Sequence, residues 1–140
     1  EALSIPEKIN NFIINDKILL ADLPGYGYAK LSKFQSKKIN ILIHDYIENR
    51  NNLLKVFLLI DIRHEPIKTD LKFIEYLSNI RKDFHIIFTK SDKIKKSELA
   101  KKSKNYVEKI DSHYLDKKFF ISSSSTNSGR EEILNFIISD

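Results

Sequence analysis

Residues Leu54–Asp61 have the sequence LKVFLLID, a nearly continuous apolar run that ends in a carboxylate. Such a run is typical of a strand that is covered on both faces, as strands are in a parallel sheet. Further buried strands are predicted over Phe84–Phe88 and Lys118–Ile121. Amphipathic helices are predicted between these strands, over Ile67–Arg81 and Ser97–Tyr114. Strands that alternate with helices predict an α/β layer fold with a mostly parallel sheet.

The residues before this core predict a β-hairpin and a helix. The strands of the hairpin are Ile9–Ile14 and Lys17–Asp22, and Asn15-Asp16 form the turn between them. The helix extends over Leu31–Asn49, because apolar residues recur there at spacings of three and four.

Two serines are candidates for the caps of helices. Ser32 is expected to cap the helix that follows the hairpin. Ser128 and Glu131 fit a capping box before the last helix, whose apolar stripe is expected at Ile133, Leu134 and Ile137.

The composition fits one globular domain over residues 1–140, since 41% of the residues are hydrophobic and 31% are charged. The absence of cysteine excludes disulfides, thiolate metal sites and cysteine catalysis. The net charge of +5 indicates either an anionic partner or only a lysine-rich solvated surface. No apolar run approaches the roughly 20 residues of a membrane span, so a cytoplasmic or organellar protein without membrane contact is expected.

Polar residues follow the predicted strands, where ligands bind in open α/β sheets. At the end of the hairpin, Asp22 is suited to a water-mediated contact with Mg²⁺, and Gly25 exposes a backbone N–H to a phosphate. The same residues also fit a tight turn in which the aspartate caps the backbone. Neither interpretation is decided by these residues alone.

The sequence TKSD at residues 89–92 follows the second buried strand. The carboxylate of Asp92 can accept two parallel hydrogen bonds from N1–H and the 2-amino group of guanine, a donor pair that adenine lacks. The aliphatic stem of Lys90 can lie along the base. An ordinary polar loop explains the same residues. Likewise, the serines at 122–125 are expected either in a solvated loop or with backbone N–H groups directed at a guanine carbonyl.

Taken in order, these motifs resemble the second part of a Ras-like, translation-factor-class GTPase domain of the EngB family (also called YihA or YsxC). The resemblance is carried by DLPGYGYAK at 22–30, DIRHEP at 61–66 and TKSDK at 89–93. Ser123 and Ser124, followed by Gly129, match the last guanine loop of the family. The match extends from about residue 9 to the end of the chain.

The resemblance implies a three-layer P-loop NTPase fold, a Ras-like G domain, with the hairpin at an antiparallel edge of the sheet. It implies binding of GTP or GDP with Mg²⁺ and assistance in assembling the large ribosomal subunit. It also associates the chain with septation in cell division. The residues implied at the nucleotide are Asp22, Pro24, Gly25, Thr89, Lys90, Asp92, Ser123 and Ser124, with Asp22 also on the metal side.

The sequence departs from the family pattern in three respects. No G-x-x-x-x-G-K-[ST] motif occurs in the 140 residues, so the first strand, the phosphate loop and the first helix of the domain are expected outside this chain. No Thr precedes Thr69 to act as a switch residue. Tyr26 follows Gly25 where Ras-type enzymes have a water-orienting Gln, and no residue of the chain is assigned as catalytic.

These departures leave the function open between two classes. One is a slow GTPase that a partner accelerates, and the other is a monomeric assembly scaffold whose degenerate G domain no longer binds nucleotide. Ribosomal RNA is a candidate partner for exposed lysines of the chain. The lysine groups considered are Lys30, Lys33, Lys37 and Lys38; Lys90, Lys93, Lys95 and Lys96; and Lys101, Lys102, Lys104 and Lys109.

Overall fold

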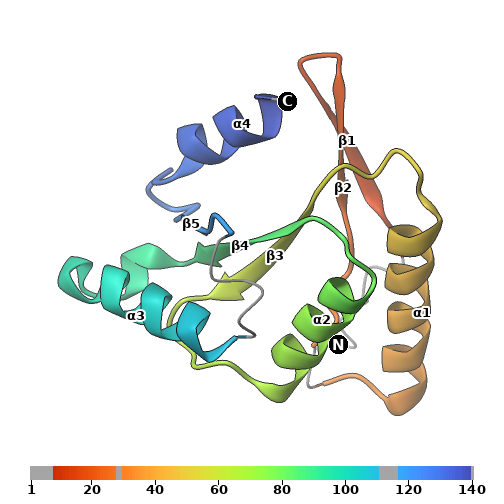
Figure 1. Ribbon diagram of the computed structural model, residues 1–140, viewed down its shortest axis with the longest axis horizontal. Coiled ribbons are helices and arrows are strands. Elements are labelled where there is room, and N and C mark those ends of the chain that lie inside the picture. The colour runs from red at the N-terminus through yellow and green to blue at the C-terminus, as the bar shows by residue number, and fades with distance from the viewer. Residues whose placement is uncertain (1–7, 28–29, 111–116, 140) are drawn as a thin grey trace, which may run out of the picture. The chain divides into compact units, whose positions relative to one another are not determined.

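The computed structural model describes residues 8–27, 30–110 and 117–139, which form two compact units divided after Leu53 (Figure 1). The described strands form two sheets, an antiparallel hairpin in the first unit and a parallel three-stranded sheet in the second. The predicted α/β class, with a parallel sheet and an antiparallel hairpin, is therefore confirmed. The single domain over residues 1–140 stays a prediction.

The elements of the first unit are β1 (Asn10–Ile14), β2 (Ile18–Asp22) and α1 (Lys33–Asn49). Those of the second are β3 (Val56–Asp61), α2 (Lys68–Asn79), β4 (Phe84–Thr89), the 3₁₀ turn η1 (Ser91–Lys93), α3 (Lys96–Lys109), β5 (Phe120–Ile121) and α4 (Arg130–Ile138).

The hairpin turn lies where the sequence predicts it, but it is one residue longer, since Lys17 belongs to the turn and β2 begins at Ile18. Ile14 lies opposite Ile18, and the two residues between Ile14 and Lys17, Asn15 and Asp16, have φ angles of 52° and 54°. Positive φ at both central residues defines a type I′ turn, whose twist matches that of the flanking strands. The amide of Lys17 donates to the carbonyl of Ile14 over 3.1 Å and closes the turn.

The cap of α1 is also the predicted one. The hydroxyl of Ser32 accepts a hydrogen bond from the amide of Gln35 at 3.2 Å, and the amide of Ser32 donates to Oε1 of Gln35 at 3.1 Å. This reciprocal pair is a capping box that satisfies two amides otherwise left open at a helix start. Ile39, Ile43 and Ile47, spaced by four residues, are the buried face of the helix.

One face of the parallel sheet is covered by α2 and α3. Tyr106 of α3 packs edge-on against Phe88 of β4, with ring centroids 5.3 Å apart. Its hydroxyl donates to Asp70 of α2 over 3.3 Å, so the two helices lie on the same face (Figure 1). Of the stripe expected on α2, Ile74 and Leu77 are buried, whereas Leu71 is exposed.

The opposite face of the sheet is covered by α4 through one aromatic side chain. The ring of Phe136 lies 4.7 Å from His85 and 5.0 Å from Phe120, measured between centroids. Along β3 the contact of Phe136 is with Phe57, at 6.3 Å, and Leu59 beyond it is 62% exposed. The prediction that residues 54–61 are covered on both faces is therefore wrong for this face, because no described side chain of the unit buries Leu59.

The start of α4 differs from the predicted capping box. The N-cap is Gly129 with φ of +78°, and no side chain caps the helix. Ser128 lies one residue before the N-cap, and its backbone forms a β-bridge with Ser123. The stripe of Ile133, Leu134 and Ile137 is only half-buried.

Two further findings concern the helices. Helix α3 ends at Lys109, and the predicted continuation to Tyr114 lies outside the described residues. No helix in the described ranges is long and apolar enough to cross a membrane.

Candidate functional site

The carboxyl ends of β3, β4 and β5 meet at one edge of the parallel sheet. Asp61 pairs with Thr89, and Phe88 pairs with Ile121, so the loops that follow the three strands begin side by side. The amide of Ser122 continues the ladder by donating to the carbonyl of Phe88 over 2.7 Å. The sheet register therefore brings together three polar segments that are far apart in the sequence, as predicted for strand ends.

The loop after β4 is held in one conformation by the backbone. The hydroxyl of Thr89 donates to the carbonyl of Ile60 at 3.3 Å, and the amide of Ser91 donates to the carbonyl of Ser122 at 3.0 Å. Lys90 between them is left-handed, with φ of 59° and ψ of 34°, and accepts a bond from the amide of Lys93 at 2.9 Å. A lysine adopts this conformation only at a cost in energy, and such residues occur often at functional sites.

Asp92 and Ser123 form the most specific contact of the site. The hydroxyl of Ser123, which is 2% exposed, donates to Oδ1 of Asp92 over 2.7 Å. The same oxygen of Ser123 accepts from the amide of Thr126 at 3.3 Å, which fixes the hydroxyl between two partners. The hydrogen bond from Ser123 holds the pKa of Asp92 below its usual value, so the side chain is a carboxylate near neutral pH. Ser124 follows in the exposed turn at 124–127.

Asp61 joins this site from the end of β3, and the site residues expected from the sequence did not include it. Its Oδ2 lies 3.1 Å from Nζ of Lys90 and 2.7 Å from an Nη of Arg63. Hydrogen bonds from Arg63 and the neighbouring Lys90 hold the pKa of Asp61 well below its usual range. The signal in the sequence was an aspartate at a strand end with an arginine two residues later, a spacing that favours a bidentate contact.

The other residues expected at the site, Asp22, Pro24 and Gly25, belong to the first unit. Asp22 is the exposed last residue of β2, Pro24 is buried, and Gly25 is exposed just before the turn at Tyr26. In the described parts of the chain, no group of three or more His, Cys, Asp or Glu side chains is arranged to hold a metal ion.

The arrangement in the second unit suits a flat ligand with adjacent N–H donors. One carboxylate oxygen of Asp92 is oriented by Ser123, and the other lies 3.6 Å from Nζ of exposed Lys93. A carboxylate fixed in this way can accept two parallel hydrogen bonds. A ligand that lacks the matching donors leaves a carboxylate oxygen without a hydrogen bond, so the site rejects it. The residues present therefore fit the guanine base that the sequence predicts.

Known proteins that share one name are similar to most of this chain. "Probable GTP-binding protein EngB" of Phocaeicola vulgatus is 43% identical over 130 residues, covering 92% of this chain and 65% of that protein. The proteins of the same name from Bacteroides thetaiotaomicron and Flavobacterium psychrophilum are 43% identical over 130 and 137 residues, and the chain covers 64% of each. The chain thus spans slightly less than two thirds of the length of these relatives.

A solved structure is similar in fold. The crystal structure of a probable GTP-binding protein engB matches with a TM-score of 0.76 and 23% sequence identity, covering 95% of this chain and 81% of that one. No family model matches the chain.

Proposed function

We propose that the chain is a member of the EngB family, as its similarity to these relatives indicates, and that it binds guanine nucleotides at the carboxyl end of its parallel sheet. The observation that carries the proposal is the 2.7 Å hydrogen bond that orients the Asp92 carboxylate from buried Ser123. The names of the relatives, which describe GTP-binding proteins, support the same ligand.

Each residue of the second unit has a separate role in this proposal. Asp92 accepts hydrogen bonds from N1–H and the 2-amino group of guanine, which selects guanine over adenine. Lys90 lies along the base with its aliphatic stem. Thr89 fixes the start of the loop through its bond to the carbonyl of Ile60. Ser123 and Ser124 close the loop over the base.

For the phosphate side, we propose Asp22, Pro24 and Gly25 as the contacts of the first unit. Asp22 is suited to hold Mg²⁺ through a water molecule, because Mg²⁺ retains most of its hydration in proteins. Gly25 offers an exposed amide to a phosphate oxygen, and buried Pro24 fixes the chain between them. When bound, Mg²⁺ would neutralise part of the negative charge of the phosphates.

We further propose the three-layer arrangement of a P-loop NTPase for the whole protein. The 62% exposed Leu59 on β3 supports an additional layer over that face, since strands of a parallel sheet are ordinarily covered on both faces. The lack of an assigned general base beside Gly25 supports slow intrinsic GTP hydrolysis that a partner accelerates.

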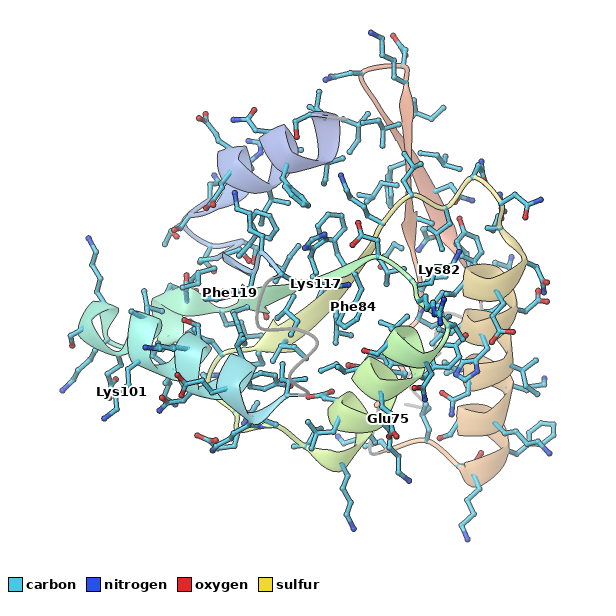
Figure 2. The ribbon with its side chains drawn as sticks, in the orientation of Figure 1. Glu75, Lys82, Phe84, Lys101, Lys117 and Phe119 are labelled. Carbon is cyan, nitrogen blue, oxygen red and sulfur yellow. The ribbon has the colours of Figure 1, made fainter. Side chains whose placement is uncertain are left out.

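The experiment that tests the nucleotide proposal is a titration of the full-length protein with fluorescently labelled GDP, GTP and ATP. Saturable binding of GDP and GTP without binding of ATP is expected, and Asp92→Asn should lose it. Asp83→Asn is the matched control, since Asp83 pairs with Lys117 at the amino end of β4, where Lys117 lies 4.4 Å over the ring of Phe84 (Figure 2). A folded protein that binds no nucleotide would instead indicate the scaffold class, and preference for ATP would refute the guanine assignment.

For the partner, we propose the precursor of the large ribosomal subunit, bound through phosphate groups of its RNA. The net charge of +5 and the exposed lysines of α1 and α3 support an anionic partner. Lys101, for example, points away from α3 (Figure 2). Because each neutralised phosphate releases counterions, binding should weaken steeply as salt is raised.

Two charge-reversal variants separate the candidate basic faces. Lys101→Glu with Lys104→Glu tests α3, and Lys33→Glu with Lys37→Glu tests α1. The binding of each double variant to purified large ribosomal subunits is measured by sedimentation at rising salt. Only one of the two double variants should bind more weakly, and with less dependence on salt, than the wild type. Binding that does not change with salt would contradict the proposal.

A further inference from the structure

We propose that Asp61, at the end of β3, is a positioning residue that fixes the Lys90 side chain across the base-binding site. The inference rests on the proposed guanine site and extends it to a residue outside the nucleotide-binding loops. Asp61 itself touches no base in this scheme. It acts through the ammonium group of Lys90.

The first argument is the geometry of the pair. Oδ2 of Asp61 and Nζ of Lys90 are 3.1 Å apart, and Asp61 lies beside Thr89 in the sheet register. The Asp61 side chain is 18% exposed, whereas that of Lys90 is 54% exposed. The carboxylate is therefore the anchored member of the pair, and the long lysine side chain is the member whose freedom the contact removes.

The second argument is the backbone of Lys90. Its left-handed conformation sets the direction in which the side chain leaves the loop, and the bond from the amide of Lys93 to its carbonyl holds that conformation. Both ends of the lysine are then fixed, the backbone by the turn and the ammonium by Asp61. The aliphatic stem is extended between them before any ligand arrives. Because a lysine otherwise loses rotamer freedom when a ligand orders it, a stem fixed in advance increases affinity.

Arg63 also contacts Asp61, and these contacts define the alternative that the test has to exclude. The Nε of Arg63 donates to both carboxylate oxygens of Asp61, at 3.0 and 3.2 Å, and the Arg63 amide donates to Oδ1 at 3.0 Å. The carbonyl of Arg63 in turn accepts from Nζ of Lys102 at 3.3 Å. These contacts suggest an alternative role for Asp61, in which it orders the loop after β3 through Arg63 and has no effect on the ligand.

The test measures the dissociation constant of labelled GDP for the full-length protein and its variants. Asp61→Asn and Lys90→Met should each weaken binding by about tenfold, since a charge-assisted contact is typically worth about that factor. Met keeps an aliphatic stem but has no ammonium. The double variant should be no weaker than Lys90→Met alone, because both substitutions break the same contact. Additive losses in the double variant would overturn the proposal.

Two further variants distinguish positioning from loop order. Arg63→Gln leaves the contact between Lys90 and Asp61 in place, so GDP affinity should stay within about twofold of the wild type. A loss as large as that of Asp61→Asn would overturn the proposal in favour of the loop-ordering role. Asp83→Asn removes a carboxylate at the other end of β4 and should leave affinity unchanged. Since Arg63 is exposed, its variant gives a result even if Asp61→Asn does not fold.

The last measurement compares the affinities of the variants for GDP and for a closely related nucleotide. Inosine diphosphate lacks the 2-amino group that Asp92 is proposed to bind, so Asp92→Asn should reduce the preference for GDP over this analogue. Asp61→Asn should weaken both nucleotides by the same factor, because Lys90 lies along the plane of the base and not at its edge. If the wild type does not bind GDP at all, the proposed function fails. If it binds GDP and Asp61→Asn binds equally well, only the role of Asp61 fails.

Discussion

Substitution of Gly129 by alanine is expected to damage both the stability of the second unit and the candidate site. Gly129 precedes α4 with φ of +78°, and a Cβ built on it would lie 2.1 Å from the carbonyl oxygen of Ile121. The neighbouring contacts are also with backbone, at 3.1 Å to the Ile121 carbonyl carbon and 3.3 Å to Cα of Ser122. Since backbone atoms cannot rotate away, the chain after β5 has to move.

The magnitude follows from two contributions. An alanine with positive φ costs about 1 kcal/mol relative to glycine. Displacement of the chain at Ile121 strains the hydrogen bonds from Ser122 to Phe88 and from Ser91 to Ser122, each worth about 1 kcal/mol. A destabilisation of about 2–3 kcal/mol is therefore expected.

The assay is urea unfolding of the full-length protein, followed together with binding of labelled GDP. The urea concentration at the midpoint of unfolding should fall. The slope of the unfolding free energy against urea concentration should change little, because the same surface is exposed on unfolding. GDP affinity should also fall, because displacement of Ile121 and Ser122 moves Ser123 away from Asp92. Ser128→Ala is the matched control, and it should stay within about 0.5 kcal/mol of the wild type. A cost for Gly129→Ala below about 0.5 kcal/mol would refute this reasoning.

Three further predictions concern other positions. Asp16→Gly should stabilise the hairpin by about 0.5–1 kcal/mol, because glycine adopts the positive φ of this type I′ turn without strain; a lower melting temperature would contradict this. Ser123→Ala should cost about 1–3 kcal/mol in urea unfolding, because the amide of Thr126 loses its acceptor, and it should also weaken GDP binding; unchanged GDP affinity would show that Asp92 needs no orienting partner. Finally, the lowered pKa of Asp61 adds stability that is present above its unfolded pKa of about 4 and is lost as the pH falls. The melting temperature of Asp61→Asn should therefore fall less than that of the wild type between about pH 5 and 2, and parallel curves would contradict the assignment.

Local features of the fold could be predicted because neighbouring residues determine them. The turn at Asn15-Asp16 requires only two residues that tolerate positive φ, and the cap at Ser32 requires only a partner three residues later. The capping box expected at Ser128 was wrong because the N-cap is the next residue, Gly129, which has a positive φ and no side chain to accept a hydrogen bond. No periodicity within the last helix contains that information.

The site was predictable to the extent that its residues directly follow a strand. Asp92 and Ser123 were expected from their loops, and the structure places them in contact. Asp61 was not expected at the site because its role depends on the register that aligns β3 with β4 and brings its carboxylate to Lys90. Register is set by pairing across the sheet, and a single sequence does not reveal it.

In the second unit, the proposed recognition of the base and the stability of the fold are expected to depend on the same few hydrogen bonds. The bonds from Ser91 to Ser122 and from Ser122 to Phe88 join the loops after β4 and β5, and they also hold Ser123 at Asp92. Variants that loosen these loops, such as Gly129→Ala, should therefore lose affinity and stability together. Asp16→Gly changes the stability of a turn in the first unit, and guanine selectivity should not change. Separate responses of this kind would indicate that the base-binding edge belongs to the second unit alone.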